Sequence, residues 1–218
     1  MGLGRLDHER FEAVIFDMDG TLINSIPSVD RSWRAWAGEY ALTEEQILGH
    51  HGVPAAEIVR RLIPEANRNR AYARINEIEL ADVDDIVVLP GAAEALAALK
   101  EAKNAIATSC TTALATVRIA ASGLAAPTII VTADDVTRGK PYPDPFLLAA
   151  RRLGVDPRRC LVVEDAPSGL QAARDAGCFS LAVLVTTPRD ALQADAIVTD
   201  LADVEFSVTP EGIAVRSA

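Results

Sequence analysis

The chain contains the run Ala13-Val14-Ile15-Phe16-Asp17-Met18-Asp19-Gly20-Thr21, which gives the clearest indication of its fold. Its four apolar residues predict a buried strand, and two carboxylates follow where that strand opens into a loop. Because ligands bind at the carboxyl ends of strands in open α/β sheets, we expect Asp17 and Asp19 to converge at such an edge. One carboxylate can then attack a substrate while the other moves protons. The alternative is a loop with a helix cap, since Asp, Gly and Thr also favour turns.

Apolar runs and helix-like stretches alternate along most of the chain. This alternation predicts a parallel sheet with crossover helices, and so an α/β fold. Strands are expected at 13–16, 104–108, 129–132, 160–164, 180–185 and 196–198, and helices at 91–102, 112–122, 143–153 and 168–176.

The segment from about Pro27 to Val88 interrupts this alternation. It has helix-like periodicity, contains both tryptophans and shows no convincing strand. We expect a small helical cap domain at 27–88, inserted into a core domain formed by 1–26 and 89–218. Such a cap would lie over the carboxyl edge of the sheet, where it could exclude water and select the substrate. The alternative is an ordinary extra helical layer.

Composition limits the classes of function. The 218 residues carry a formal net charge of −10, which argues against binding nucleic acids or anionic membranes. No apolar run reaches the roughly 18 residues of a membrane span, and the N-terminus shows no signal-peptide pattern, so we expect a cytoplasmic protein. The three widely spaced cysteines suggest neither a disulfide framework nor a clustered zinc site, and we expect them in the core. A monomer is expected.

Two polar motifs follow predicted strands further along the chain. Thr108 and Ser109 come after the apolar run 105–107, where their hydroxyls could hold an anion or cap the next helix. Lys140 lies among rigid residues in Gly139-Lys140-Pro141-Tyr142-Pro143, where it could balance phosphate or clustered carboxylates, or be a solvated loop lysine.

Two adjacent acids, Glu164 and Asp165, end another predicted strand. Together with Asp17 and Asp19 they offer hard oxygen ligands without histidine or cysteine. That donor set favours Mg²⁺, which accepts few protein ligands beside water and a phosphate oxygen. A helix-capping role for Asp165 is the alternative.

The order of these motifs resembles the haloacid dehalogenase superfamily, in particular its phosphatases with a helical cap after the first motif. The resemblance covers essentially the whole chain and implies a Rossmann-like, doubly wound parallel sheet. The runs 132–136 and 163–169, with Gly139-Lys140-Pro141, look like the branch of sugar, sugar-alcohol and glycerol-phosphate phosphatases, to which β-phosphoglucomutases are related.

What the resemblance implies for catalysis concerns three residues. Asp17 would be the nucleophile that forms an aspartyl-phosphate, and Asp19 would protonate the leaving alcohol and then activate water. Lys140 would bridge the nucleophile and the phosphate. The expected activity is Mg²⁺-dependent hydrolysis of a small phosphorylated metabolite.

The resemblance also implies a binding set. Mg²⁺ would be held by Asp17, the Asp19 backbone carbonyl and Asp165. Glu164 would be either a direct ligand of the ion or an outer-sphere ligand. The phosphoryl group would be bound by Thr108 and Ser109, and further substrate-binding candidates are Gly20 and His51.

Three alternative functions can be compared with hydrolysis: a mutase, a catalytically silent module and a dehalogenase. A mutase would need a cationic stretch there, and the corresponding run Gly49–Ala55 has no Arg or Lys, although His50 and His51 could contribute charge or hydrogen bonds. This favours simple hydrolysis. A catalytically silent phosphometabolite-binding module remains open, whereas Asp19 argues against a dehalogenase. Trp33, Trp36 and Glu57 could line the leaving-group pocket, or the tryptophans could only pack.

Overall fold

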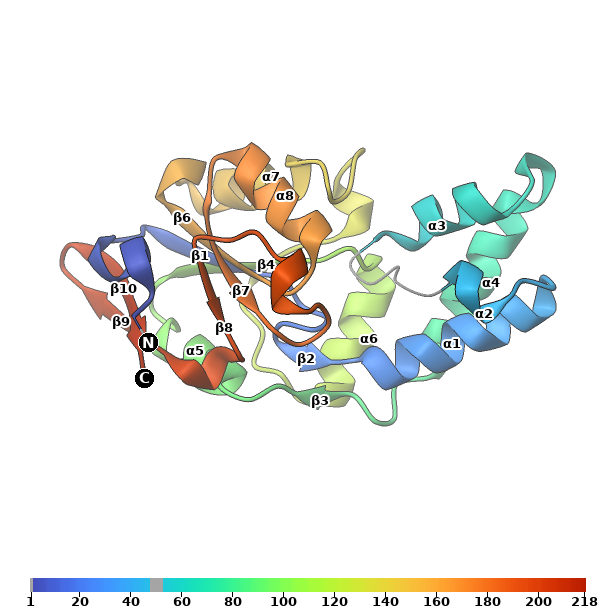
Figure 1. The fold of residues 1–218 in the computed structure, drawn as a ribbon, viewed down its shortest axis with the longest axis horizontal. Helices are drawn as coiled ribbons and strands as arrows, with labels where there is room; N and C mark the ends of the chain where they lie inside the picture. Colours follow the sequence, from blue (N-terminus) through green and yellow to red (C-terminus); the bar gives the residue numbers. More distant parts are fainter. Residues whose placement is uncertain (1, 48–52) are drawn as a thin grey trace.

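The computed structural model describes residues 2–47 and 53–218, and within them six parallel strands form one central sheet (Figure 1). The strand order is β5-β4-β1-β6-β7-β8, so β1 lies between β4 and β6. Successive strands are thus placed on both sides of β1, which creates a switch point at its carboxyl end. The strands are β1 (Ala13–Phe16), β4 (Lys103–Ala107), β5 (Ile129–Val131), β6 (Cys160–Glu164), β7 (Phe179–Val183) and β8 (Ala196–Val198).

Both faces of the sheet are covered, which explains why a central strand such as β1 has a continuous apolar sequence. Alternate residues of β1 enter different cores: Val14 and Phe16 pack on the side of α5 and α6, Ala13 and Ile15 on the side of α7 and α8. The predicted doubly wound α/β fold is confirmed. The covering helices are α5 (Ala92–Ala98), α6 (Thr112–Ser122), α7 (Asp144–Leu153) and α8 (Pro167–Ala176).

Two strand pairs were not expected from the sequence. An antiparallel hairpin, β9 (Val204–Thr209) and β10 (Gly212–Ser217), packs against the α5 side of the core. A short ribbon pairs β2 (Ile23–Asn24) with β3 (Val87–Val88). The expectation of no strand in 27–88 is therefore wrong at its end, because Val87 and Val88 gain strand geometry by pairing with distant residues.

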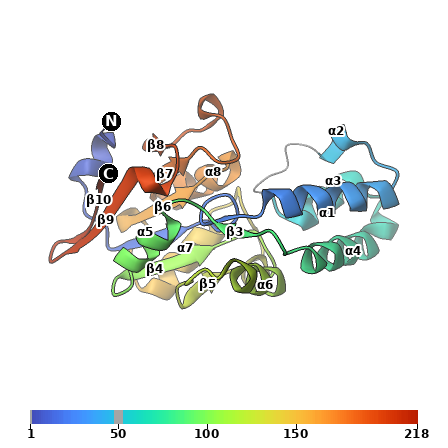
Figure 2. The same cartoon turned by 90° about the horizontal axis from the view of Figure 1, so that it is seen from below.

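The helical segment consists of α1 (Ile26–Glu39), α2 (Glu44–Ile47), α3 (Ala55–Leu62) and α4 (Arg68–Ala81), which lie together beyond one end of the sheet (Figures 1 and 2). It has an apolar cluster of its own around Trp36 and Ile75, separate from the clusters of the sheet. Trp36 is fully buried there and donates from Nε1 to the Ala71 carbonyl oxygen at 2.9 Å. A cap domain at 27–88 remains a prediction, supported by this separate core.

The ribbon β2–β3 brings together the two chain segments that connect the helical segment to the sheet. Leu89 extends it by donating its backbone N–H to the Leu22 carbonyl oxygen at 2.9 Å. Beside it, the Arg31 side chain on α1 pairs with Asp82 and Asp85 at 2.7 Å each. Both connections are thus held close to each other.

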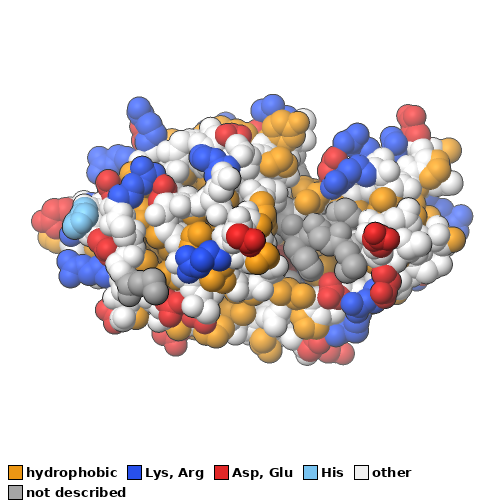
Figure 3. All heavy atoms as spheres, in the orientation of Figure 1, with side chains coloured by type: hydrophobic (Ala, Val, Ile, Leu, Met, Phe, Trp, Pro, Cys, Tyr) orange, Lys and Arg blue, Asp and Glu red, His pale blue; other side chains and the backbone are white. Residues whose placement is uncertain are grey.

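Several connections between the strands and helices contain short 3-10 helices. On the face of the molecule drawn in Figure 3, charged side chains of both signs are interspersed. Cys110, Cys160 and Cys178 are buried, as expected. None of the helices among the described residues has the length and apolarity needed to cross a membrane. The 3-10 helices are η1 (Gly4–His8), η2 (Glu65–Asn67), η3 (Ala133–Asp135), η4 (Pro157–Arg159), η5 (Arg189–Ala191) and η6 (Leu201–Asp203).

Candidate active site

Three neighbouring strands deliver polar residues to one edge of the sheet. Asp17 follows β1, Thr108 follows β4, and β6 ends in Glu164 with Asp165 directly after it. Because β4, β1 and β6 are parallel neighbours, these side chains reach the same place. All four residues are buried, with exposed fractions of 1–6%.

Lys140 lies in the loop between β5 and α7, and its side chain reaches this group of acidic residues. Its Nζ donates hydrogen bonds to Asp17 Oδ1 and, at 2.8 Å, to Glu164 Oε1. Burial opposes the charged form of the lysine, but the two carboxylates prevail and raise its pKa above the ordinary value. Lys140 is therefore a fixed positive charge beside Asp17.

Glu164 is held by the backbone just before α8 as well as by Lys140. Its Oε2 accepts hydrogen bonds from the backbone N–H groups of Asp165 and Ala166, both at 2.7 Å. Gly169 packs against the same carboxylate, since a Cβ atom at that glycine would lie 1.6 Å from Glu164 Oε1. Both carboxylate oxygens are thus engaged by the protein.

Asp165 is positioned by two loops, the one that carries the first acidic pair and the one that follows β7. Its carboxylate accepts hydrogen bonds from the hydroxyls of Thr21, at 3.4 Å, and Thr186. Gly20 has a φ of +85° and passes so close that a Cβ atom there would lie 2.3 Å from Asp165 Oδ2. A side chain at Gly20 would therefore displace Asp165.

The acidic group fits a divalent cation. Asp17, Glu164 and Asp165 each offer a carboxylate oxygen, and these oxygens lie within 4.8 Å of one another. Burial raises the pKa of Asp17 to about 8, and burial followed by the Glu164 charge raises the pKa of Asp165. Three buried carboxylates against one lysine leave negative charge that a hard, oxygen-binding dication would balance.

Asp19 points away from this acidic group, toward α6 and the helical segment. Its Oδ1 accepts from Ser25 Oγ and, at 2.9 Å, from Arg118 Nη1. Cys110 Sγ lies 3.0 Å from its Oδ2. About a quarter of the Asp19 side chain, 23%, remains exposed. Asp19 is thus held by protein donors and still accessible from the pocket.

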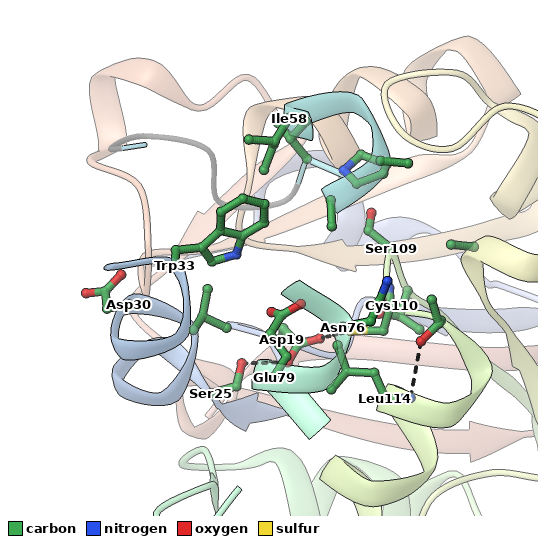
Figure 4. A pocket seen from close by; sticks show the side chains of 18 of the residues that line it. Asp19, Ser25, Asp30, Trp33, Ile58, Asn76, Glu79, Ser109, Cys110 and Leu114 are labelled. Atoms are coloured by element: carbon green, nitrogen blue, oxygen red, sulfur yellow. Dashed lines mark hydrogen bonds between the residues drawn. The ribbon is translucent and has the colours of Figure 1, made fainter. Parts of the chain in front are cut away.

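A pocket between the sheet edge and the helical segment opens onto these residues (Figure 4). Its floor includes Asp17, Asp19, Thr108 and Ser109, so the predicted hydroxyl pair lies beside the predicted acidic pair. Ser109 is labelled in Figure 4 on the loop that leads toward α6.

Predicted residues of the helical segment have different places. Trp33 lines the pocket, whereas Trp36 packs inside the segment. Glu57 lies at the surface, where it accepts from Arg60 Nε at 2.8 Å, and it is not among the described residues that line the pocket. His50 and His51 fall outside the described residues.

Among the charged pocket residues that the sequence analysis does not single out, two are buried. Arg118 on α6 donates to Asp19 and, from Nη2 at 3.1 Å, to Glu79 Oε1 on α4. Arg118 is 2% exposed and Glu79 is 5% exposed. The sequence contains one signal that could have identified Arg118, since it is the one charged residue in the mostly apolar stretch Thr112–Ser122.

Comparison with known proteins gives consistent matches over most of the chain. The model of the haloacid dehalogenase-like hydrolase family matches residues 11–177. Hexitol phosphatase A of Escherichia coli is 37% identical over 210 residues, which cover 93% of this chain and 97% of that protein. Glycerol-1-phosphate phosphohydrolase 2 of Saccharomyces cerevisiae is 33% identical over 197 residues, which cover 84% of this chain and 79% of that protein. The crystal structure of a hydrolase from Pseudomonas syringae matches with a TM-score of 0.80 and 28% identity. The match covers 88% of this chain and 95% of that one.

Proposed function

Because the chain belongs to the haloacid dehalogenase-like hydrolase family, we propose that it hydrolyses small phosphate monoesters, with Asp17 as the nucleophile. The observation that carries the proposal is the buried arrangement of Asp17 against Lys140, open on one side to the pocket that contains Asp19. The relatives named for hexitol and glycerol 1-phosphate point to sugar, sugar-alcohol or glycerol phosphates as the substrate class.

Asp17 and Asp19 carry the two halves of the proposed reaction. A bond forms between an Asp17 oxygen and phosphorus while the bond from phosphorus to the leaving oxygen breaks, and Asp19 gives that oxygen a proton. Water then attacks the phosphorus of the aspartyl-phosphate. Asp19 takes the proton from this water, and inorganic phosphate leaves with Asp17 regenerated.

The surrounding residues offset the repulsion between a carboxylate and a phosphate dianion. Lys140 supplies a fixed positive charge next to Asp17, and Thr108 and Ser109 line the floor where the phosphoryl oxygens would lie. Gly20 lets the backbone pass close to Asp165 there. His51 remains a candidate contact of the leaving group.

Mg²⁺ is the proposed cofactor, held by Asp17, Asp165 and the Asp19 backbone carbonyl. When bound, it would neutralise charge on the phosphoryl oxygens and on the attacking carboxylate. Glu164 already accepts hydrogen bonds on both oxygens, from Lys140 and from the backbone N–H of Asp165. We therefore assign Glu164 to positioning Lys140 rather than to direct contact with the ion.

The test is phosphate release from a panel of hexitol, sugar and glycerol phosphates with Mg²⁺, using wild type and Asp17→Asn. We expect turnover of at least one compound that is lost in the variant and on chelation with EDTA. Isomerisation of glucose 1-phosphate faster than phosphate release would instead indicate a mutase. Binding of these compounds without turnover would indicate a silent module.

A further inference from the structure

Arg118 and Glu79 form a buried ion pair in the wall of the pocket, directly beside Asp19. A contribution to folding stability does not by itself explain such a pair, because apolar residues of similar size at the same positions often give an equally stable protein. The pair also joins α6, which packs on the sheet, to α4 of the helical segment. Its position in the pocket suggests a role toward the substrate.

The hydrogen bonds of the guanidinium group are incomplete. Nη1 donates to Asp19 Oδ1 at 2.9 Å and contacts Cys110 Sγ at 3.1 Å, and Nη2 donates to Glu79. Arg118 Nε is buried and has no acceptor among the described residues. A buried N–H without a partner is costly, so a small shift of the Arg118 side chain that brings it to an oxygen of a ligand in the pocket would be favoured. Glu79 also keeps acceptor capacity beyond the one bond from Arg118.

The distance to Asp19 limits which ligand oxygen this is. In the proposed reaction Asp19 contacts the leaving oxygen, and Arg118 Nη1 lies 2.9 Å from the Asp19 carboxylate. A ligand group bound by Arg118 must therefore lie next to the leaving oxygen. The nearest such group in a polyol phosphate is the hydroxyl on the carbon adjacent to the ester carbon.

Helix α4 presents polar residues to the pocket, and apolar residues of α1 and α3 lie opposite them. Tyr72, Asn76 and Glu79 are spaced four and three residues apart, so they share one face of α4, and all three line the pocket. Trp33 and Ile58 lie across the pocket from Asn76 and Glu79 (Figure 4). An extended polyol has hydroxyls for the polar side and carbon–hydrogen surface for the apolar side.

We propose that Arg118 and Glu79 form a subsite for the hydroxyl adjacent to the phosphate ester, which makes this protein selective for polyol phosphates over simple alkyl phosphates. The proposal rests on the proposed hydrolase function. Arg118 donates to the hydroxyl oxygen, and Glu79 accepts the hydroxyl proton.

The test compares two substrates that differ only in this hydroxyl, 1,2-propanediol 1-phosphate and 1-propyl phosphate. We expect the wild type to favour the diol phosphate in kcat/KM by about 10- to 100-fold, as for a hydrogen bond to a charged group. In the double variant Glu79→Leu/Arg118→Met the ratio is expected to fall to about 2 or less. Because both substrates need Asp19 equally, the ratio separates this contact from any displacement of Asp19.

The double variant removes both charges together, which avoids leaving one buried charge unpaired. Glu79→Gln, of nearly the same shape, is the second variant and is expected to reduce the ratio partly. The matched control is Arg74→Met on the outer side of α4, where Arg74 pairs with Glu39; its ratio should equal that of the wild type.

Equal turnover of the two substrates by the wild type, or an unchanged ratio in folded Glu79→Leu/Arg118→Met, overturns the proposed subsite and leaves the hydrolase function standing. Failure of the wild type to hydrolyse any phosphate ester, p-nitrophenyl phosphate included, overturns the hydrolase function and the subsite with it.

Discussion

Gly169 on α8 packs directly against the Glu164 carboxylate, so closely that a Cβ atom would lie 1.6 Å from Glu164 Oε1. Gly169→Ala should therefore move Glu164, which positions Lys140. We expect a loss of about 1–3 kcal/mol in the free energy of unfolding, as for other overpacked sites, together with reduced kcat. Urea unfolding and phosphate release measure the two effects.

Gly38→Ala is the matched control, because nothing lies within 4 Å of a Cβ atom at Gly38, near the end of α1. It should stabilise the protein by up to about 1 kcal/mol through helix propensity and leave kcat unchanged. Equal behaviour of the two variants would contradict the packing argument.

Lys140→Met should impair both the reaction and the fold. It removes the cation between Asp17 and Glu164, so we expect kcat to fall by at least about 10²-fold. Leaving the buried carboxylates unpaired should cost about 3–5 kcal/mol in the free energy of unfolding. Lys100→Met, at an exposed position, is the control. Near-normal kcat in Lys140→Met would exclude the assigned role.

The raised pKa of Asp17 gives a pH dependence of known sign in the metal-free protein. Its pKa is about 8 when folded against an ordinary 3.8, because burial disfavours the carboxylate. Between these values the folded state binds more protons than the unfolded state, so the contribution of Asp17 to stability falls as pH rises. Asp17→Asn removes this contribution.

We therefore expect Asp17→Asn to gain stability relative to wild type as pH rises from about 5 to about 8, with no further gain above that. Urea midpoints in EDTA across this range provide the measurement. A stability difference that is constant or shrinks with pH would contradict the raised pKa of Asp17.

Mg²⁺ should stabilise the folded protein through the acidic group. A ligand that binds only the folded state adds about 2.7 kcal/mol at 100 times its dissociation constant. Asp165→Asn should lose most of this shift in thermal unfolding, whereas Asp175→Asn, at an exposed position on α8, should keep it. An equal Mg²⁺-induced shift in both variants would place the ion elsewhere.

Elements whose signals are local could be predicted from the sequence. The sequence predicts the helix 112–122 with its observed bounds, since Thr111 caps its start and Gly123, with a φ of +69°, ends it. The strand 13–16 was placed equally well, since burial on both faces gives it a continuous apolar run. The ribbon β2–β3 has no such signal, because two-residue strands depend on pairing between distant segments.

The same distinction applies to the candidate site. Residues at strand ends, such as Asp17 and Asp165, were found because the sheet edge collects them. Arg118 was not, because its partners Asp19 and Glu79 are 99 and 39 residues away in the chain. Only the assembled fold shows that these charges meet in the pocket.

Phosphorylation of Asp17 during turnover distinguishes nucleophilic attack by Asp17 from direct attack by water. Wild type and Asp19→Asn would be acid-quenched during reaction with p-nitrophenyl phosphate, whose leaving group needs no proton from Asp19, and the peptide containing residue 17 would be analysed by mass spectrometry. We predict one added phosphoryl group on Asp17, accumulating in Asp19→Asn because water is no longer activated. Turnover with no phosphoryl group on Asp17, or wild-type turnover by Asp17→Asn, would contradict the account.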